Sequence, residues 1–146
     1  MKLLWNPTVM TFDFIVPEME ASAGVQKVGG FSRGWHHKNS IRCGIRKENN
    51  YYVLYLYAYV NGKFIVERID ERFEGKEHIC VELGFGLYTY VRICRYGQKE
   101  VWFGRQISNW SKSLPIGYQL YPYAETDGTN QKEIPLNIKL NNVVIR

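Results

Sequence analysis

Residues 51–60, YYVLYLYAYV, are ten consecutive residues of types that favour β-strands. Successive side chains of a strand point to opposite faces, so the segment separates into two chemically different sides. The odd positions are Tyr51, Val53, Tyr55, Tyr57 and Tyr59, and the even positions are Tyr52, Leu54, Leu56, Ala58 and Val60. The even side therefore predicts core. The tyrosine-rich odd side is either a second buried surface or a surface for a ligand.

Asn61-Gly62 follows directly and precedes a second alternating segment, residues 63–69 (KFIVERI). Asn-Gly is typical of a type I′ turn, which joins two strands into a tight hairpin. The expected register places Tyr59 opposite Phe64, Tyr57 opposite Val66 and Tyr55 opposite Arg68. It also places Glu67 opposite Leu56, which implies either that Glu67 lies on an edge strand or that the loop is longer.

Short alternating segments separated by turn residues continue along the chain. Further strands are expected at residues 9–16, 39–47, 77–83, 87–95, 101–104, 116–123 and 134–144. Residues 18–24 could hold one helical turn, Gly29-Gly30 is expected to interrupt the chain, and Gly84-Phe85-Gly86 is expected to form a turn. About nine short strands with little or no helix predict an all-β, two-sheet antiparallel sandwich or jelly roll, with a closed barrel as the nearest alternative.

The composition is that of one globular domain spanning residues 1–146, with 45% hydrophobic and 23% charged residues. The net charge of +5 permits attraction to anionic partners but does not determine the fold. The three cysteines, Cys43, Cys80 and Cys94, are too few for a disulfide framework and are expected to be free thiols. The sequence shows neither a signal peptide nor an apolar run long enough to span a membrane, which predicts a cytoplasmic or virion-associated protein.

Residues 36–44 (HHKNSIRCG), the tyrosine-rich hairpin and residues 117–123 (GYQLYPY) resemble small bacterial and phage sandwich proteins. Those proteins are in turn similar to the concanavalin A-like lectin and glucanase jelly rolls. The resemblance implies two curved antiparallel sheets whose concave side is the ligand groove in carbohydrate-active relatives. The sequence departs from the glucanase pattern, because Glu67 and Glu71 share a strand face while Asp70 points to the other. Residues 127–130 also contain too few carboxylates for the calcium loop of legume lectins.

The candidate binding surface combines aromatic rings with guanidinium groups. Its residues are Tyr55, Tyr57, Tyr59, Tyr88, Tyr90, Arg92, Arg42 and Trp35. If the strands that carry them belong to one sheet, the side chains form a continuous patch, with Trp35 at its rim. Rings that stack on sugar faces, beside hydroxyl and guanidinium donors, have the chemistry that a glycan requires. The alternative is that the partner sheet, a loop or another subunit buries these rings.

Other constellations give weaker indications. His36 and His37 point to opposite sides of an extended chain and cannot easily chelate one metal, and His78 with Cys80 would need further ligands. Neither a metal site nor a cofactor is therefore expected. Basic residues among aromatics at residues 92–96 are compatible with single-stranded nucleic acid, but the dispersed charge and the missing helices of an RNA-recognition fold disfavour that partner.

Three functions remain in order of preference. The first is a non-catalytic module that binds a glycan through the Tyr/Trp/Arg-rich sheet face. The second is a structural or virion protein, such as a phage capsid or tail decoration component, that assembles with protein subunits or as a homo-oligomer through the same face. The third is a carbohydrate-active enzyme, which requires two carboxyl groups within about 5–10 Å of each other in a groove.

Overall fold

The computed structural model describes residues 8–19, 24–33, 37–85, 89–97, 103–108, 118–120, 125–126 and 140–145. These residues form strands joined by turns and contain no helix. The strands are β1 (Thr8–Ile15), β2 (Gln26–Arg33), β3 (Ser40–Glu48), β4 (Tyr51–Val60), β5 (Lys63–Phe73), β6 (His78–Phe85), β7 (Thr89–Arg95), β8 (Phe103–Ser108), β9 (Tyr118–Leu120), β10 (Glu125–Thr126) and β11 (Asn141–Ile145). Within the described ranges, no helix has the length and apolarity needed to cross a bilayer.

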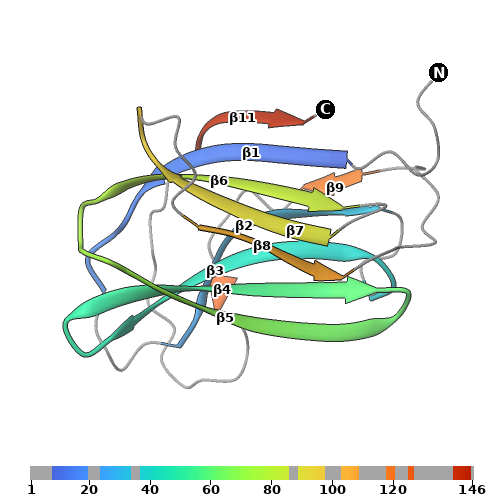
Figure 1. The fold of residues 1–146 in the computed structure, drawn as a ribbon, viewed down its shortest axis with the longest axis horizontal. Coiled ribbons are helices and arrows are strands. Elements are labelled where there is room, and N and C mark those ends of the chain that lie inside the picture. Colours follow the sequence, from blue (N-terminus) through green and yellow to red (C-terminus); the bar gives the residue numbers. More distant parts are fainter. Residues whose placement is uncertain are drawn as a thin grey trace.

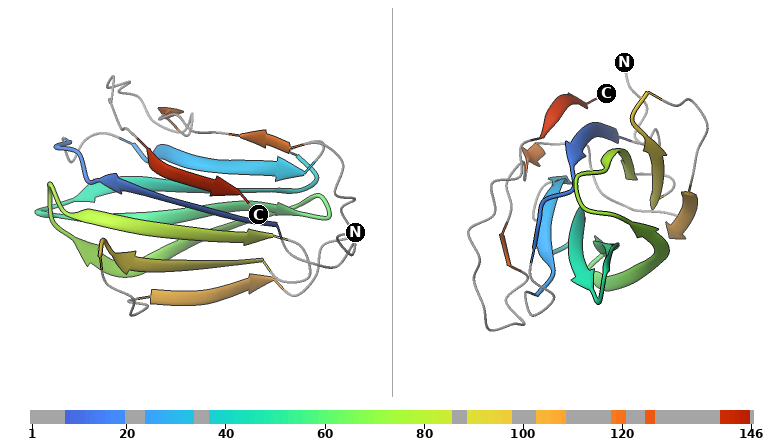
Figure 2. Two further views of the ribbon diagram at one scale, coloured as in Figure 1. Left: turned by 90° about the horizontal axis from the view of Figure 1, so that it is seen from above. Right: turned by 90° about the vertical axis from the view of Figure 1, so that its left-hand side faces the viewer.

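The strands form two antiparallel sheets that pack face to face (Figures 1 and 2). One sheet has five strands in the order β11-β1-β6-β7-β8, and the other has six. In the six-stranded sheet the order is β10-β2-β3-β4-β5, and β9 pairs with β2 off this path. The prediction of an all-β, two-sheet antiparallel sandwich is confirmed.

Strand β4 divides into the two faces that its sequence predicts. Its even side chains, Tyr52, Leu54, Leu56, Ala58 and Val60, all lie in the core between the sheets. Side chains of the five-stranded sheet, such as Phe14 and Ile93, meet them there. Phe31 of β2 and Phe85 of β6 join the two layers through an edge-to-face ring contact with centroids 6.4 Å apart. Burial of each large apolar side chain in this core contributes about 1.5–3 kcal/mol to the free energy of folding.

The register of the β4–β5 hairpin is also as predicted. Tyr59 pairs with Phe64, Tyr57 with Val66, Tyr55 with Arg68 and Leu56 with Glu67. Asn61 and Gly62 have φ angles of 53° and 85°, the pair of positive values that a type I′ turn requires. Of the two explanations for Glu67, the edge strand is the correct one, because β5 is the last strand of its sheet. An inward-pointing charge on an edge strand discourages further strand pairing.

Two glycine predictions are wrong for a common reason. Gly29 and Gly30 lie inside β2 and do not interrupt it, and Gly84 and Phe85, the first two residues of the predicted turn, lie inside β6. A Cβ at Gly30 would lie 2.2 Å from the carbonyl oxygen of Ile41, and one at Gly84 would lie 1.9 Å from Cε1 of Tyr90. These glycines permit close approach of a neighbouring backbone or ring within a strand.

Several predicted boundaries shift along the chain. Strand β8 extends from Phe103 to Ser108, four residues beyond the expected end at residue 104. Strand β10 is not among the expected strands, and β11 begins at Asn141, within the strand expected at residues 134–144. Most of the helical turn expected at residues 18–24 lies outside the described residues.

Replacement of Gly30 by alanine tests the close approach of β2 to β3. The added methyl group must displace backbone atoms of β3, so we expect Gly30→Ala to lower the free energy of unfolding by about 1–3 kcal/mol. Gly75→Ala is the matched control, because its Cβ would meet only the side chain of Glu18. Its effect should stay within about 0.5 kcal/mol. Equilibrium unfolding in urea measures both variants, and equal stabilities would contradict the interpretation.

Candidate functional site

The structure divides the predicted site residues between the two sheets. Tyr55, Tyr57 and Tyr59 lie on β4 and Arg42 on β3, all on the outer face of the six-stranded sheet. Tyr90 and Arg92 lie on β7 and therefore belong to the five-stranded sheet. The expectation of one continuous patch is wrong, because the strand order separates segments with the same alternation. Trp35 and Tyr88 lie outside the described residues.

On the six-stranded sheet, aromatic rings form a row that we call the aromatic ribbon. It consists of Tyr55, Tyr57, Phe64, Tyr59 and His37. Successive ring centroids are separated by 6.5 Å (Tyr55–Tyr57), 6.3 Å (Tyr57–Phe64), 4.8 Å (Phe64–Tyr59) and 5.5 Å (Tyr59–His37). Sequence reasoning did not select Phe64 or His37 as site residues. The cross-strand register, which was already predicted, could have identified Phe64.

Exposure differs sharply along this surface. Tyr57 and Arg42 are only 7% and 8% exposed, so little of either side chain is available to a ligand. Tyr55 and Tyr59 are half-buried, whereas Phe64 is 50% and Val66 47% exposed. The accessible part of the aromatic ribbon therefore lies toward the edge strand β5, with Tyr57 as its support.

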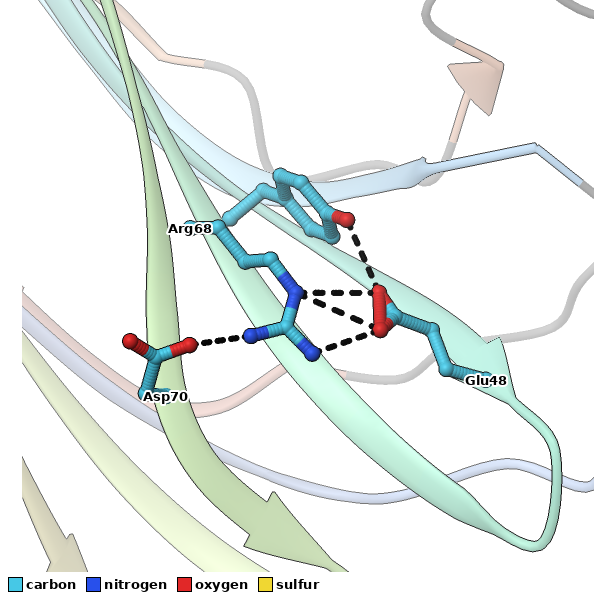
Figure 3. A network of polar contacts seen from close by, with 4 residues as sticks. Glu48, Arg68 and Asp70 are labelled. Carbon is cyan, nitrogen blue, oxygen red and sulfur yellow. Dashed lines mark hydrogen bonds and ion pairs between the residues drawn. The ribbon is translucent and has the colours of Figure 1, made fainter.

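A polar network adjoins the Tyr55 end of the aromatic ribbon (Figure 3). Arg68 on β5 donates from Nη2 to Oε1 of Glu48 on β3 at 2.6 Å, and its Nη1 pairs with Asp70. The Tyr55 hydroxyl donates to Oε2 of Glu48 at 2.9 Å. Three neighbouring strands thus hold these groups in fixed positions.

The network changes the acidity of its members. Hydrogen bonds from Arg68 lower the pKa of Glu48, against the opposing effect of burial, and the bond from Tyr55 lowers it further. Burial raises the pKa of Tyr55, and its hydrogen bond to the Glu48 carboxylate raises it further. Glu48 is therefore a carboxylate at neutral pH, and Tyr55 keeps its proton.

The outer face of the five-stranded sheet contains a groove of about 460 Å³. Arg92 lines it, together with two carboxylates, Asp13 and Glu82. Asp13 is buried and bonds to Nε2 of His78 at 2.6 Å and to Nδ2 of Asn142 at 2.7 Å. A carbohydrate-active enzyme requires at least two carboxyl groups in one groove. Asp13 and Glu82 meet this requirement, but both carboxylates already bind neighbouring side chains.

Tyr90 has a supporting position beside this groove. Its hydroxyl donates to Oε2 of Glu82 at 3.0 Å, and Nη1 of Arg92 lies 3.5 Å from the same oxygen. Its ring covers Gly84. Tyr90 therefore orients Glu82, while Arg92, which is exposed, is directly accessible to a ligand.

A larger cavity of about 620 Å³ lies where the β3–β4 turn meets the β5–β6 connection. The guanidinium of Arg72 stacks on the ring of Tyr51 at 4.1 Å, and Nε of Arg95 donates to Oε1 of Glu77 at 2.6 Å. Of the predicted site residues whose positions the structure describes, none lines this cavity.

These observations define the chain as a two-sheet β-sandwich with chemically distinct outer faces. No family model and no curated protein matches the sequence. Among solved structures, the chain is similar to Xyloglucan PUL GH43B from Bacteroides ovatus, with a TM-score of 0.51 and 12% sequence identity. The match covers 97% of this chain and 27% of that protein, so the chain spans about a quarter of its length. At this identity the comparison supports the sandwich fold alone.

Removal of Arg68 tests the polar network through the pH dependence of stability. Because the pKa of Glu48 is lowered on folding, the ionised carboxylate stabilises the folded state. This contribution to the free energy of unfolding is fully present above the ordinary glutamate pKa of about 4.3, and it is lost as the pH falls through the folded-state pKa. Arg68→Met should therefore lower the free energy of unfolding at pH 7 by about 0.2–1 kcal/mol, as for a partly exposed ion pair.

Urea unfolding at several pH values measures this effect. The difference between the protein and Arg68→Met should shrink as Glu48 is protonated. Arg72→Met is the control on the same strand, because Arg72 contacts the Tyr51 ring. If the free energy of unfolding lost in Arg68→Met stays constant while the pH falls low enough to protonate Glu48, the coupling to Glu48 is contradicted.

Proposed function

We propose that the chain is a non-catalytic binding module that recognises a glycan through the accessible part of the aromatic ribbon. The observation that carries the proposal is the pair Phe64–Tyr59, whose rings lie 4.8 Å apart on the surface while Phe64 remains 50% exposed. Contiguous exposed apolar side chains mark interaction sites more often than single ones do, and Val66, 47% exposed, extends the surface beside Phe64.

The chemistry of this surface suits a sugar. Pyranose rings present flat C–H faces that stack on aromatic rings, and Phe64 with Tyr59 offers two such rings. Sugar hydroxyls require fixed donors and acceptors, which Arg68, Glu48 and Asp70 provide beside Tyr55. The proposal therefore combines a stacking platform with a hydrogen-bonding end.

The predicted residues have different roles in this proposal. Tyr59 and Tyr55 contact the ligand, while Tyr57 and Arg42 support the rings from below. The fold is compatible with this function but does not establish it, since one fold hosts many functions. The similar Bacteroides ovatus protein is named for a xyloglucan PUL, and xyloglucan is therefore the first ligand to test.

Truncation of Phe64 tests the glycan proposal. A stacked ring contributes about 0.5–1.5 kcal/mol beyond its buried area, so Phe64→Ala should weaken binding by roughly 3–10-fold or more. Binding is measured on an array of immobilised polysaccharides, xyloglucan and bacterial capsules among them. Ile15→Ala, which removes another exposed hydrophobic side chain from the other sheet, should bind as the unmodified protein does. The proposal is dropped if no polysaccharide gives a signal that Phe64→Ala weakens.

Assembly through the same surface is the second candidate. Phe64 and Val66 are both exposed and adjacent on one face of β5, which favours contact with another protein surface. In this alternative the chain is a structural protein, such as a virion component, and the aromatic ribbon packs against neighbouring subunits.

Oligomeric state separates the two candidates. If the face joins subunits, light scattering after gel filtration should show a concentration-dependent oligomer that Phe64→Asp dissociates. A stable contact should bury well over 1,000 Å² in total. A protein that remains monomeric up to millimolar concentration, alone and with components of its native particle, would eliminate this candidate.

A further inference from the structure

Two cysteines face each other on the outer side of the five-stranded sheet, away from the aromatic ribbon. Cys80 of β6 pairs directly with Cys94 of β7. Both are free, partly exposed thiols, and both line the 460 Å³ groove. Because the third cysteine, Cys43, lies in the core, the two form an isolated pair of accessible thiols.

The hydrogen-bond pattern determines how far apart these thiols are held. The amide of Tyr96 donates to the carbonyl of His78 at 3.0 Å, which makes that position a hydrogen-bonded pair. Hydrogen-bonded and non-hydrogen-bonded pairs alternate along an antiparallel ladder. The register shows no shift from Ile79 to Gly84, so Cys80 and Cys94, two residues further on, also form a hydrogen-bonded pair.

This spacing favours a bridging atom over a direct sulfur–sulfur bond. Cα atoms of a hydrogen-bonded pair lie about 5.5 Å apart, and their Cβ atoms lie near the upper end of the range of about 4.5–5.5 Å. A disulfide requires Cβ atoms about 3.5–4.5 Å apart. A metal ion with metal–sulfur bonds of about 2.3 Å can join two sulfur atoms that are up to about 4.6 Å apart.

A buried carboxylate lies next to the two thiols. Cys80 lies opposite the buried Asp13 of β1, which His78 and Asn142 hold in place. A cation held between the two sulfur atoms would be attracted to this carboxylate, and the attraction offsets part of the cost of placing two thiolates beside it.

We propose that Cys80 and Cys94 together bind one soft monovalent cation, Cu(I). Thiolates select soft metals, and two thiolates suffice for a low coordination number. The described residues contain no group of three or more His, Cys, Asp or Glu side chains arranged around a metal, which disfavours a closed tetrahedral zinc site here. On binding, each thiol releases its proton to solvent as a copper–sulfur bond forms, and no atom changes oxidation state.

Anaerobic titration of the full chain with Cu(I), in competition with a chromogenic Cu(I) chelator, tests the proposal. The expected stoichiometry is one cation per chain. Cys80→Ser and Cys94→Ser should each weaken binding by more than the roughly 10–100-fold that loss of an outer-sphere partner causes. Cys43→Ala is the control, because Cys43 is fully buried and burial raises its pKa to about 12. Circular dichroism verifies that each variant is folded.

The pH dependence supplies a second readout. Binding displaces thiol protons, so the affinity for Cu(I) should rise with pH. Three outcomes would overturn the proposal. These are unchanged binding by Cys80→Ser or Cys94→Ser, loss of binding in Cys43→Ala, and rapid closure of a Cys80–Cys94 disulfide in the folded protein by oxidised glutathione. The last would show that the sulfur atoms lie close enough to bond directly. None of these outcomes bears on glycan binding, which involves the other sheet.

Discussion

A single two-residue turn determines which face of the central hairpin is buried. Asn61 and Gly62 both adopt positive φ angles, and Val60 and Lys63 on either side of them pair directly. A slip of one residue would bring the tyrosines inward and expose Leu54 and Leu56. The turn is also tied to the start of β3, since the amide of Gly62 donates to the carbonyl of Lys38 at 2.9 Å. The register of the six-stranded sheet therefore depends on this one corner.

Local chemistry made this corner predictable from sequence, and long-range contacts made other parts unpredictable. The hairpin and β3 alternate between two kinds of side chain, so their faces follow from the period of two, and the Asn-Gly turn sets the register of the hairpin. Strand β2 was missed because Gly29-Gly30 has the composition of a break. Gly30 is required because the backbone of Ile41 passes so close, and nothing near residue 30 in the sequence reveals that approach.

The site was predictable in composition but not in location. Tyr55 and Tyr90 occupy equivalent positions on alternating strands, and sequence alone does not distinguish their sheets. Pairing of β7 with β6 and β8, rather than with β4, separates them. The groove on the five-stranded sheet was missed for a similar reason. Asp13 and Asn142 are 129 positions apart and come together only through the pairing of β1 with β11.

The exposed aromatic side chains lie on the face of the sheet, while its β5 edge is protected. Glu67 points inward on β5, and a register shift between β4 and β5 beyond Ile69 disturbs the ladder near Asp70 and Glu71. Charges and bulges of this kind oppose strand addition. Phe64 and Val66, in contrast, project from the outer face of the sheet and not from its edge. A partner that contacts these side chains therefore packs on the surface of the sheet, which suits a flat sugar ring or a protein face better than an added strand.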